Sequence, residues 1–62
     1  MKFWKYRWEK RGEHFHVDVF VANHPDQTYA NCGSLCMDQY DWSDFWEKLK
    51  CYSSVEFEEK GQ

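Results

Sequence analysis

Hydrophobic and polar residues alternate along the first part of the chain, and a period of two residues predicts β-strands. Residues 2–10 form the first predicted strand, which places three aromatic rings on one face: Trp4, Tyr6 and Trp8. Residues 13–22 form the second, with Phe15 and three valines on one face. Its other face carries two histidines, an aspartate and a phenylalanine: His14, His16, Asp18 and Phe20. Between these strands, Gly12 can supply the positive φ that a short hairpin turn needs.

The pattern then changes from strand to helix. Residues 28–37 predict a weaker third strand, antiparallel to the second, in which Gly33 indicates a bulge. Asp38 is the expected N-cap of a helix over residues 39–52. Apolar side chains recur there at helical spacing: Trp42, Phe45, Trp46, Leu49 and Tyr52. Residues 54–58 alternate again and predict a short fourth strand or an ordered tail.

These elements predict one α+β domain over residues 1–62, with a three- or four-stranded antiparallel sheet and one helix on one face. The valine side of the second strand is expected to face the helix. One helix cannot cover both faces, so the side with His14, His16, Asp18 and Phe20 is left uncovered. We expect a second copy of the chain or a target protein to cover it, and hence a homo-oligomer.

Aromatic residues account for 13 of the 62 positions: four Trp, four Tyr and five Phe. A chain near this length buries only about 60% of its unfolded surface, which leaves too little interior for so many rings. Several rings are therefore expected at the surface, where large apolar patches usually mark a contact site. So small a domain also offers little pocket for preorganised chemistry, and we predict no enzymatic activity, no catalytic residue and no cofactor.

Charge is divided unevenly along the chain, whose net charge is −3. Residues 1–12 carry five Lys or Arg against one Glu, a balance of +4, whereas residues 13–62 carry three Lys against ten carboxylates, a balance of −7. The acidic remainder disfavours sequence-independent binding to nucleic acid, because counterion release needs cations without repelling carboxylates nearby. Alternatively, the basic segment is a solvated edge strand, which its Lys and Arg side chains protect from aggregation.

The chain contains no run of 18 apolar residues, and its first ten residues mix charges with rings, so neither a membrane span nor a signal peptide is predicted. Cys32, Cys36 and Cys51 make an odd number of cysteines. An odd number favours reduced thiols over a disulfide framework. The sequence thus predicts a cytoplasmic protein with no membrane partner.

Two histidines and an aspartate at alternate positions, His14, His16 and Asp18, are candidate ligands for Zn or Fe. Such ligands lie about 6–7 Å apart along a strand and rarely converge on one ion. A polar sheet face, interface hydrogen bonds or phosphate contacts are the alternatives, and we predict no metal site. Cys32 and Cys36 lack the spacing of a zinc knuckle, and no third group indicates a Cys/His nucleophile pair.

The first strand interleaves rings with cations, a composition typical of surfaces where rings stack on bases and cations contact phosphate. In this hypothesis five residues contact phosphate: Lys5, Arg7, Arg11, His14 and His16. The stacking rings belong to Trp4, Tyr6 or Trp8. The period of two directs rings and charges to opposite faces, however, and core packing of at least one tryptophan is the alternative. In a further alternative, an acidic helix face mimics nucleic-acid phosphates and binds a basic target.

Residues 11–49 carry a pattern that resembles small proteins encoded by bacteriophages and prophages. The pattern runs Gly12-x-His14-x-His16-Val17-x-Val19-Phe20-Val21, then Asn31-Cys32-Gly33-x-Leu35-x-Met37, then Trp42-x-x-Phe45 at the start of a helix. Some small phage proteins act against bacterial defences, as anti-CRISPR inhibitors or as sponges for nucleotide signals. The resemblance implies a non-enzymatic protein that antagonises a bacterial defence component, either by sequestering a nucleotide signal or by binding a host protein. A metal-binding or assembly accessory protein that uses the His14, His16 and Asp18 face is the alternative.

Overall fold

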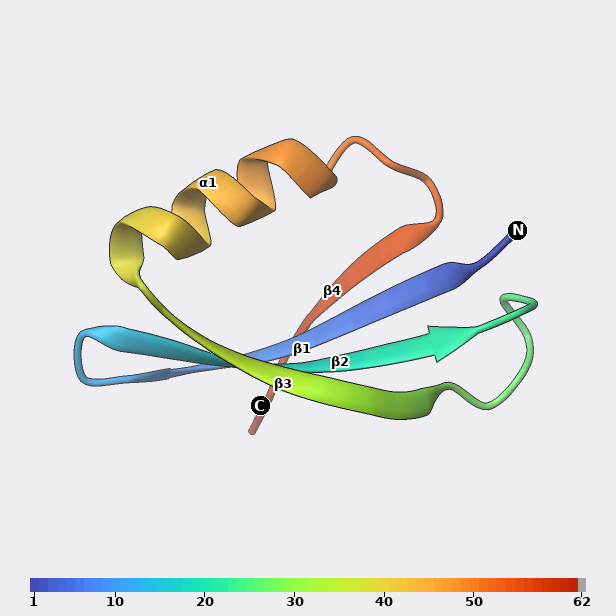
Figure 1. The fold of residues 1–62 in the computed structure, drawn as a ribbon, viewed down its shortest axis with the longest axis horizontal. Helices are drawn as coiled ribbons and strands as arrows, with labels where there is room; N and C mark the ends of the chain where they lie inside the picture. The colour runs from blue at the N-terminus through green and yellow to red at the C-terminus, as the bar shows by residue number, and fades with distance from the viewer. Residues whose placement is uncertain (62) are drawn as a thin grey trace.

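Four strands and one helix follow one another along residues 1–61, the part of the chain that the computed structural model describes (Figure 1). They are β1 (Phe3–Arg11), β2 (His14–Ala22), β3 (Ala30–Asp38), α1 (Gln39–Leu49) and β4 (Val55–Glu59). The predicted α+β class and the order of the elements are confirmed, including a fourth strand after the helix.

The strands form one sheet in the order β3-β2-β1-β4. The three-stranded antiparallel part is confirmed, whereas β4 pairs parallel with β1 and makes the sheet mixed. β1 is therefore an interior strand and not the edge strand considered above. The reason is the crossover from β3 through α1 to β4, which carries the chain past β2 and β1 before it pairs again.

Three local signals in the sequence have the structural roles predicted for them. Gly12 has a φ of 61° in the turn between β1 and β2. The pairing of β2 with β3 is irregular after Val19, which lies opposite Gly33. Asp38 caps α1, because its Oδ1 accepts a hydrogen bond of 2.8 Å from the backbone N–H of Asp41.

The helix is shorter than predicted, because α1 ends at Leu49 and not at residue 52. Two turns follow, in which the N–H of Tyr52 donates to the Leu49 carbonyl at 3.1 Å and the N–H of Val55 donates to the Tyr52 carbonyl at 3.2 Å. Tyr52 is consequently 56% exposed and does not continue the apolar side of the helix. These turns return the chain to the sheet, where β4 begins beside β1.

The core lies between α1 and one face of the sheet. Val17 is fully buried, and Phe15 and Trp42 are only 8% and 9% exposed. Partly buried side chains from β1, β3, α1 and β4 pack around them: Tyr6, Trp8, Met37, Phe45 and Phe57. The rings of Phe15 and Trp42 are stacked, with their centres 5.3 Å apart. The valine side of β2 therefore faces the helix, as predicted.

The opposite face of the sheet, called the open face below, has no helix or strand over it within residues 1–61 (Figure 1). It carries the polar side of β2: His14, His16, Asp18 and Phe20. The loop between β2 and β3 reaches one end of this face, where Tyr29 meets Lys5. The open face therefore brings the candidate residues of β2 onto a surface that no other element of the fold covers.

Candidate functional site

The pairing of the strands sets the side chains of the open face in rows that cross β1, β2 and β3. Directly opposed residues have Cβ atoms about 4.5–5.5 Å apart, so neighbours in a row can interact. Four rows follow from the register: Arg11, His14 and Asp38; Glu9, His16 and Cys36; Arg7, Asp18 and Ser34; Lys5, Phe20 and Asn31. The rows bring all the predicted phosphate-contacting residues onto one face, and they bring carboxylates beside them.

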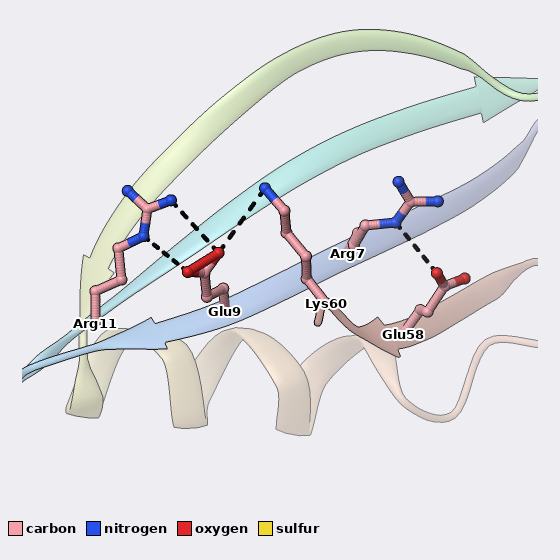
Figure 2. Close-up of polar contacts among 5 residues, drawn as sticks. All are labelled: Arg7, Glu9, Arg11, Glu58 and Lys60. Carbon is pink, nitrogen blue, oxygen red and sulfur yellow. Dashed lines mark hydrogen bonds and ion pairs between the residues drawn. The ribbon is translucent and has the colours of Figure 1, made fainter. Parts of the chain in front are cut away.

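Three cations of the open face are already bonded to carboxylates (Figure 2). Arg7 Nε lies 3.1 Å from Glu58 Oε1, and Arg11 Nε lies 3.0 Å from Glu9 Oε1. Lys60 Nζ lies 3.8 Å from Glu9 Oε2. All five side chains project from the side of the sheet that faces away from α1. Arg7 and Arg11, two of the predicted phosphate contacts, are therefore partly neutralised before any ligand arrives.

Glu9 is bonded to two cations, and its titration reflects this. The hydrogen bond from Arg11 lowers the pKa of Glu9 below its ordinary value, and the charges of Arg11, Lys60 and His16 act in the same direction. The same hydrogen bond raises the pKa of Arg11. These attractions favour the charged carboxylate, so Glu9 stays ionised to lower pH in the folded chain than in the unfolded one.

Removing Arg11 is expected to raise the pKa of Glu9 toward its ordinary value, whereas Lys10→Ala should leave the Glu9 titration where it is. A carboxyl NMR titration of wild type, Arg11→Ala and Lys10→Ala measures this. Because the folded pKa is lowered, the stabilisation from the pair is present above the unfolded pKa and is lost as pH falls through the folded pKa. An unchanged Glu9 titration in Arg11→Ala would contradict the assignment of the shift to this hydrogen bond.

A shallow hollow of about 360 Å³ lies between β1, the end of β2 and the loop before β3. Two cations and two aromatic rings contribute to it: Lys5, Arg7, Phe20 and Tyr29. Lys5 Nζ lies 4.7 Å from the centre of the Tyr29 ring, and Arg7 Cζ lies 4.9 Å from the centre of the Phe20 ring. Both distances are typical of cation–π interactions. These four residues are called the cation–ring hollow below.

Half of the cation–ring hollow is absent from the predicted ligand site. The sequence pattern places Tyr29 in the third strand, whereas it lies in the loop before β3 begins at Ala30. Phe20 is predicted only as an interface residue. Its position two residues after Asp18 indicates that it shares the polar face of β2, but its place opposite Lys5 depends on the register with β1.

The predicted stacking rings lie on the other face of the sheet. Tyr6 and Trp8 pack against the core, with ring centres 5.0 Å from Phe45 and 5.5 Å from Trp42 respectively. Burial raises the pKa of the Tyr6 hydroxyl. Trp4 has the same parity on β1 and so shares their face. The sheet thus separates these three rings from the cations of the open face, as the period of two indicates.

His14, His16 and Asp18 lie along the open face in different rows. Within residues 1–61, no group of three or more His, Cys, Asp or Glu side chains is placed to hold a metal ion. His16 instead has its Nε2 3.9 Å from the Sγ of Cys36, its neighbour in the row. The sequence gives no sign of this contact, because it depends on the register between β2 and β3. Cys32, Cys36 and Cys51 are all free, exposed thiols.

Together these features define a small α+β protein with a mixed sheet, one face of which is open and carries paired charges. No family model, no curated protein and no solved structure matches the chain. In the part that the structure describes, no helix has both the length and the apolar character to cross a membrane.

Proposed function

We propose that this is a non-enzymatic binding protein that sequesters a small nucleotide at the cation–ring hollow. The observation that carries the proposal is the placement of two cations and two rings on one accessible face, Lys5 with Tyr29 and Arg7 with Phe20. A nucleotide uses both kinds of group, because cations attract its phosphates and rings stack on its base. In this proposal Phe20 and Tyr29 stack on the base, instead of the rings of the first strand.

The hollow has donors left for a phosphate group. Arg7 bonds Glu58 through Nε, and its two terminal nitrogens point away from that carboxylate (Figure 2). Lys5 contacts the Tyr29 ring. A base that stacks on either ring takes the place of the cation there and leaves that cation free for phosphate. Base stacking on an aromatic side chain contributes about 1–3 kcal/mol, enough to support binding together with the charge contacts.

The other predicted phosphate contacts lie too far away to join a mononucleotide in the hollow. At roughly 3.3 Å per residue, the row of Glu9 and His16 is about 13 Å from Lys5 along β1, and Arg11 is about 20 Å away. Lys5 and Arg7 therefore carry the phosphate role in this proposal. Arg11, His14 and His16 would be reached only by a longer ligand that follows the strands.

The wider role in this proposal is that of a phage-encoded, cytoplasmic antagonist of a bacterial defence component, as the resemblance to small phage proteins implies. Self-association through the open face, at His14, His16, Asp18 and Phe20, belongs to the same proposal. Direct binding of a host protein to that face is its second version. The two versions predict different results with nucleotides. A protein that sequesters a nucleotide binds it stoichiometrically and releases it intact on heating, whereas a protein inhibitor does not bind nucleotides.

Calorimetric titration with nucleoside monophosphates and cyclic dinucleotides tests the nucleotide version. Phe20→Ser and Lys5→Ala are each expected to weaken binding at least tenfold, since each removes one ring or one charge from the hollow. Lys48→Ala is the matched control, because it removes a cation from α1 whose side chain is 73% exposed. No binding by the wild type at millimolar nucleotide, or equal affinity in all three variants, would overturn the proposal.

A further inference from the structure

Cys36 differs from the other two cysteines in the group that its sulfur faces. Cys32 Sγ lies 3.5 Å from the carbonyl oxygen of Val19, and Cys51 Sγ lies 3.7 Å from the carbonyl oxygen of Lys48. Each of these thiols can donate a hydrogen bond to an oxygen that does not take up the proton. Cys36 Sγ instead faces the Nε2 of His16 at 3.9 Å, and an unprotonated imidazole nitrogen can take up the proton of a thiol.

Cys36 and His16 share their row with a carboxylate. Glu9 is the register partner of His16 on β1, and the row Glu9, His16 and Cys36 crosses three strands. The charge of His16 contributes to the lowered pKa of Glu9, so the imidazole lies within electrostatic reach of this carboxylate. The row therefore supplies a thiol, a base and a negative charge in that order, the arrangement found around activated cysteines.

The space beside the sulfur can admit a small molecule. A hollow of about 320 Å³ is lined by Cys36, His16, Ser34 and Asp18 on one side and by Glu9, Arg11 and Lys60 on the other. The two cations, Arg11 and Lys60, lie beside the Glu9 carboxylate, so the hollow carries charges of both signs. Cys36 itself is exposed. In a copy whose open face is not covered by a second one, a reagent can therefore reach the sulfur without any change in the fold.

We propose that Cys36 is a nucleophilic thiol that undergoes exchange with small disulfides, with His16 as the base. The Cys36 sulfur attacks one sulfur of the disulfide while its proton passes to His16 Nε2. A bond forms between Cys36 Sγ and the attacked sulfur, and the S–S bond of the reagent breaks. The departing thiolate then takes the proton from the imidazolium. The products are a mixed disulfide on Cys36 and one free thiol, so no other oxidant is needed.

This modification site is separate from the cation–ring hollow. Cys36 and His16 lie in the row of Glu9, about 13 Å along the sheet from the row of Lys5 and Phe20. None of the four residues of the cation–ring hollow lines the hollow beside Cys36. The proposal therefore goes beyond nucleotide binding, and either one can fail without the other.

The three exposed cysteines allow the test to be made within a single wild-type molecule. Oxidised glutathione is the probe, and peptide mapping by mass spectrometry follows the mixed disulfide at each cysteine over time. Cys36 is expected to react at least tenfold faster than Cys32 and Cys51. Equal rates at the three cysteines of the folded wild type would overturn the proposal, whatever any variant does.

Two variants then test the role of His16. In His16→Gln the rate at Cys36 should fall to that of Cys32, while the rates at Cys32 and Cys51 should not change. His24→Gln is the matched control, because His24 is exposed in the loop between β2 and β3 and lines neither hollow, and it should leave the Cys36 rate intact. A Cys36 rate that is unchanged in His16→Gln, or equally reduced in both variants, would overturn the assignment of His16 as the base.

Discussion

Replacing Trp42 with alanine is expected to remove at least about a third of the free energy of unfolding. Trp42 is 9% exposed, and its ring system contacts four others, those of Trp8, Phe15, Phe45 and Phe57. Truncation of such a buried aromatic residue costs about 3–5 kcal/mol. At a typical ~0.05–0.15 kcal/mol per residue, a chain of this length has only about 3–9 kcal/mol of stability.

Urea unfolding followed by far-ultraviolet circular dichroism measures this loss, since the midpoint and slope of the transition report on the backbone structure that unfolds. Tyr40→Ala is the matched control, because Tyr40 lies on the same helix with its side chain 82% exposed. The control should stay within about 0.5 kcal/mol of the wild type. A loss of less than about 1 kcal/mol in Trp42→Ala would mean that the helix does not pack on the sheet through this ring.

The second large effect is expected at Phe57, whose replacement by alanine should release β4 from β1. The Phe57 ring centre lies 5.5 Å from that of Tyr6 and 5.8 Å from that of Trp42. β4 pairs with no strand other than β1 in the described sheet, so the contacts of this ring support a strand that is held on one side only. Since Phe57 is only partly buried, the loss should fall near the lower end of the usual range, at about 3 kcal/mol.

Hydrogen exchange distinguishes release of β4 from general loss of stability. In Phe57→Ala, the amides that join β1 to β4 should exchange faster by a larger factor than those that join β2 to β3. Glu56→Ala is the control, because residue 56 is exposed and points to the opposite side of β4. Uniform acceleration across all four strands would show that β4 unfolds only with the whole sheet.

The sequence predicts the structure wherever that structure depends on neighbours along the chain. The alternation of residues 2–10 and 13–22, the turn at Gly12 and the cap at Asp38 each depend on a few adjacent residues. The partner and direction of β4 do not. Residues 55–59 alternate in the same way whether they pair parallel or antiparallel, and the path of α1 over the sheet decides which strand they meet.

For the candidate site too, the sequence predicts what depends on adjacent residues and does not predict what depends on strand register. Parity alone indicates that the rings of the first strand and its cations lie on opposite faces. It does not indicate which rings share the face of Lys5, because that requires the register between β1 and β2 and the course of the loop that carries Tyr29. The contact of Cys36 with His16 likewise depends on the register between β2 and β3, across an interval of 20 residues.

The parallel pairing of β1 with β4 joins segments that are far apart in the sequence. Arg7 and Glu58, which bond across that pair, are separated by 51 residues, so this pairing closes a much longer loop than the hairpin of β1 and β2 and is expected to form after it. Until β4 pairs, β1 is the edge of a three-stranded sheet. Its cations, Lys5, Arg7, Lys10 and Arg11, repel a second nascent β1 and so oppose pairing between chains. The positive charge of the first twelve residues thus protects a transient edge that the finished molecule no longer has.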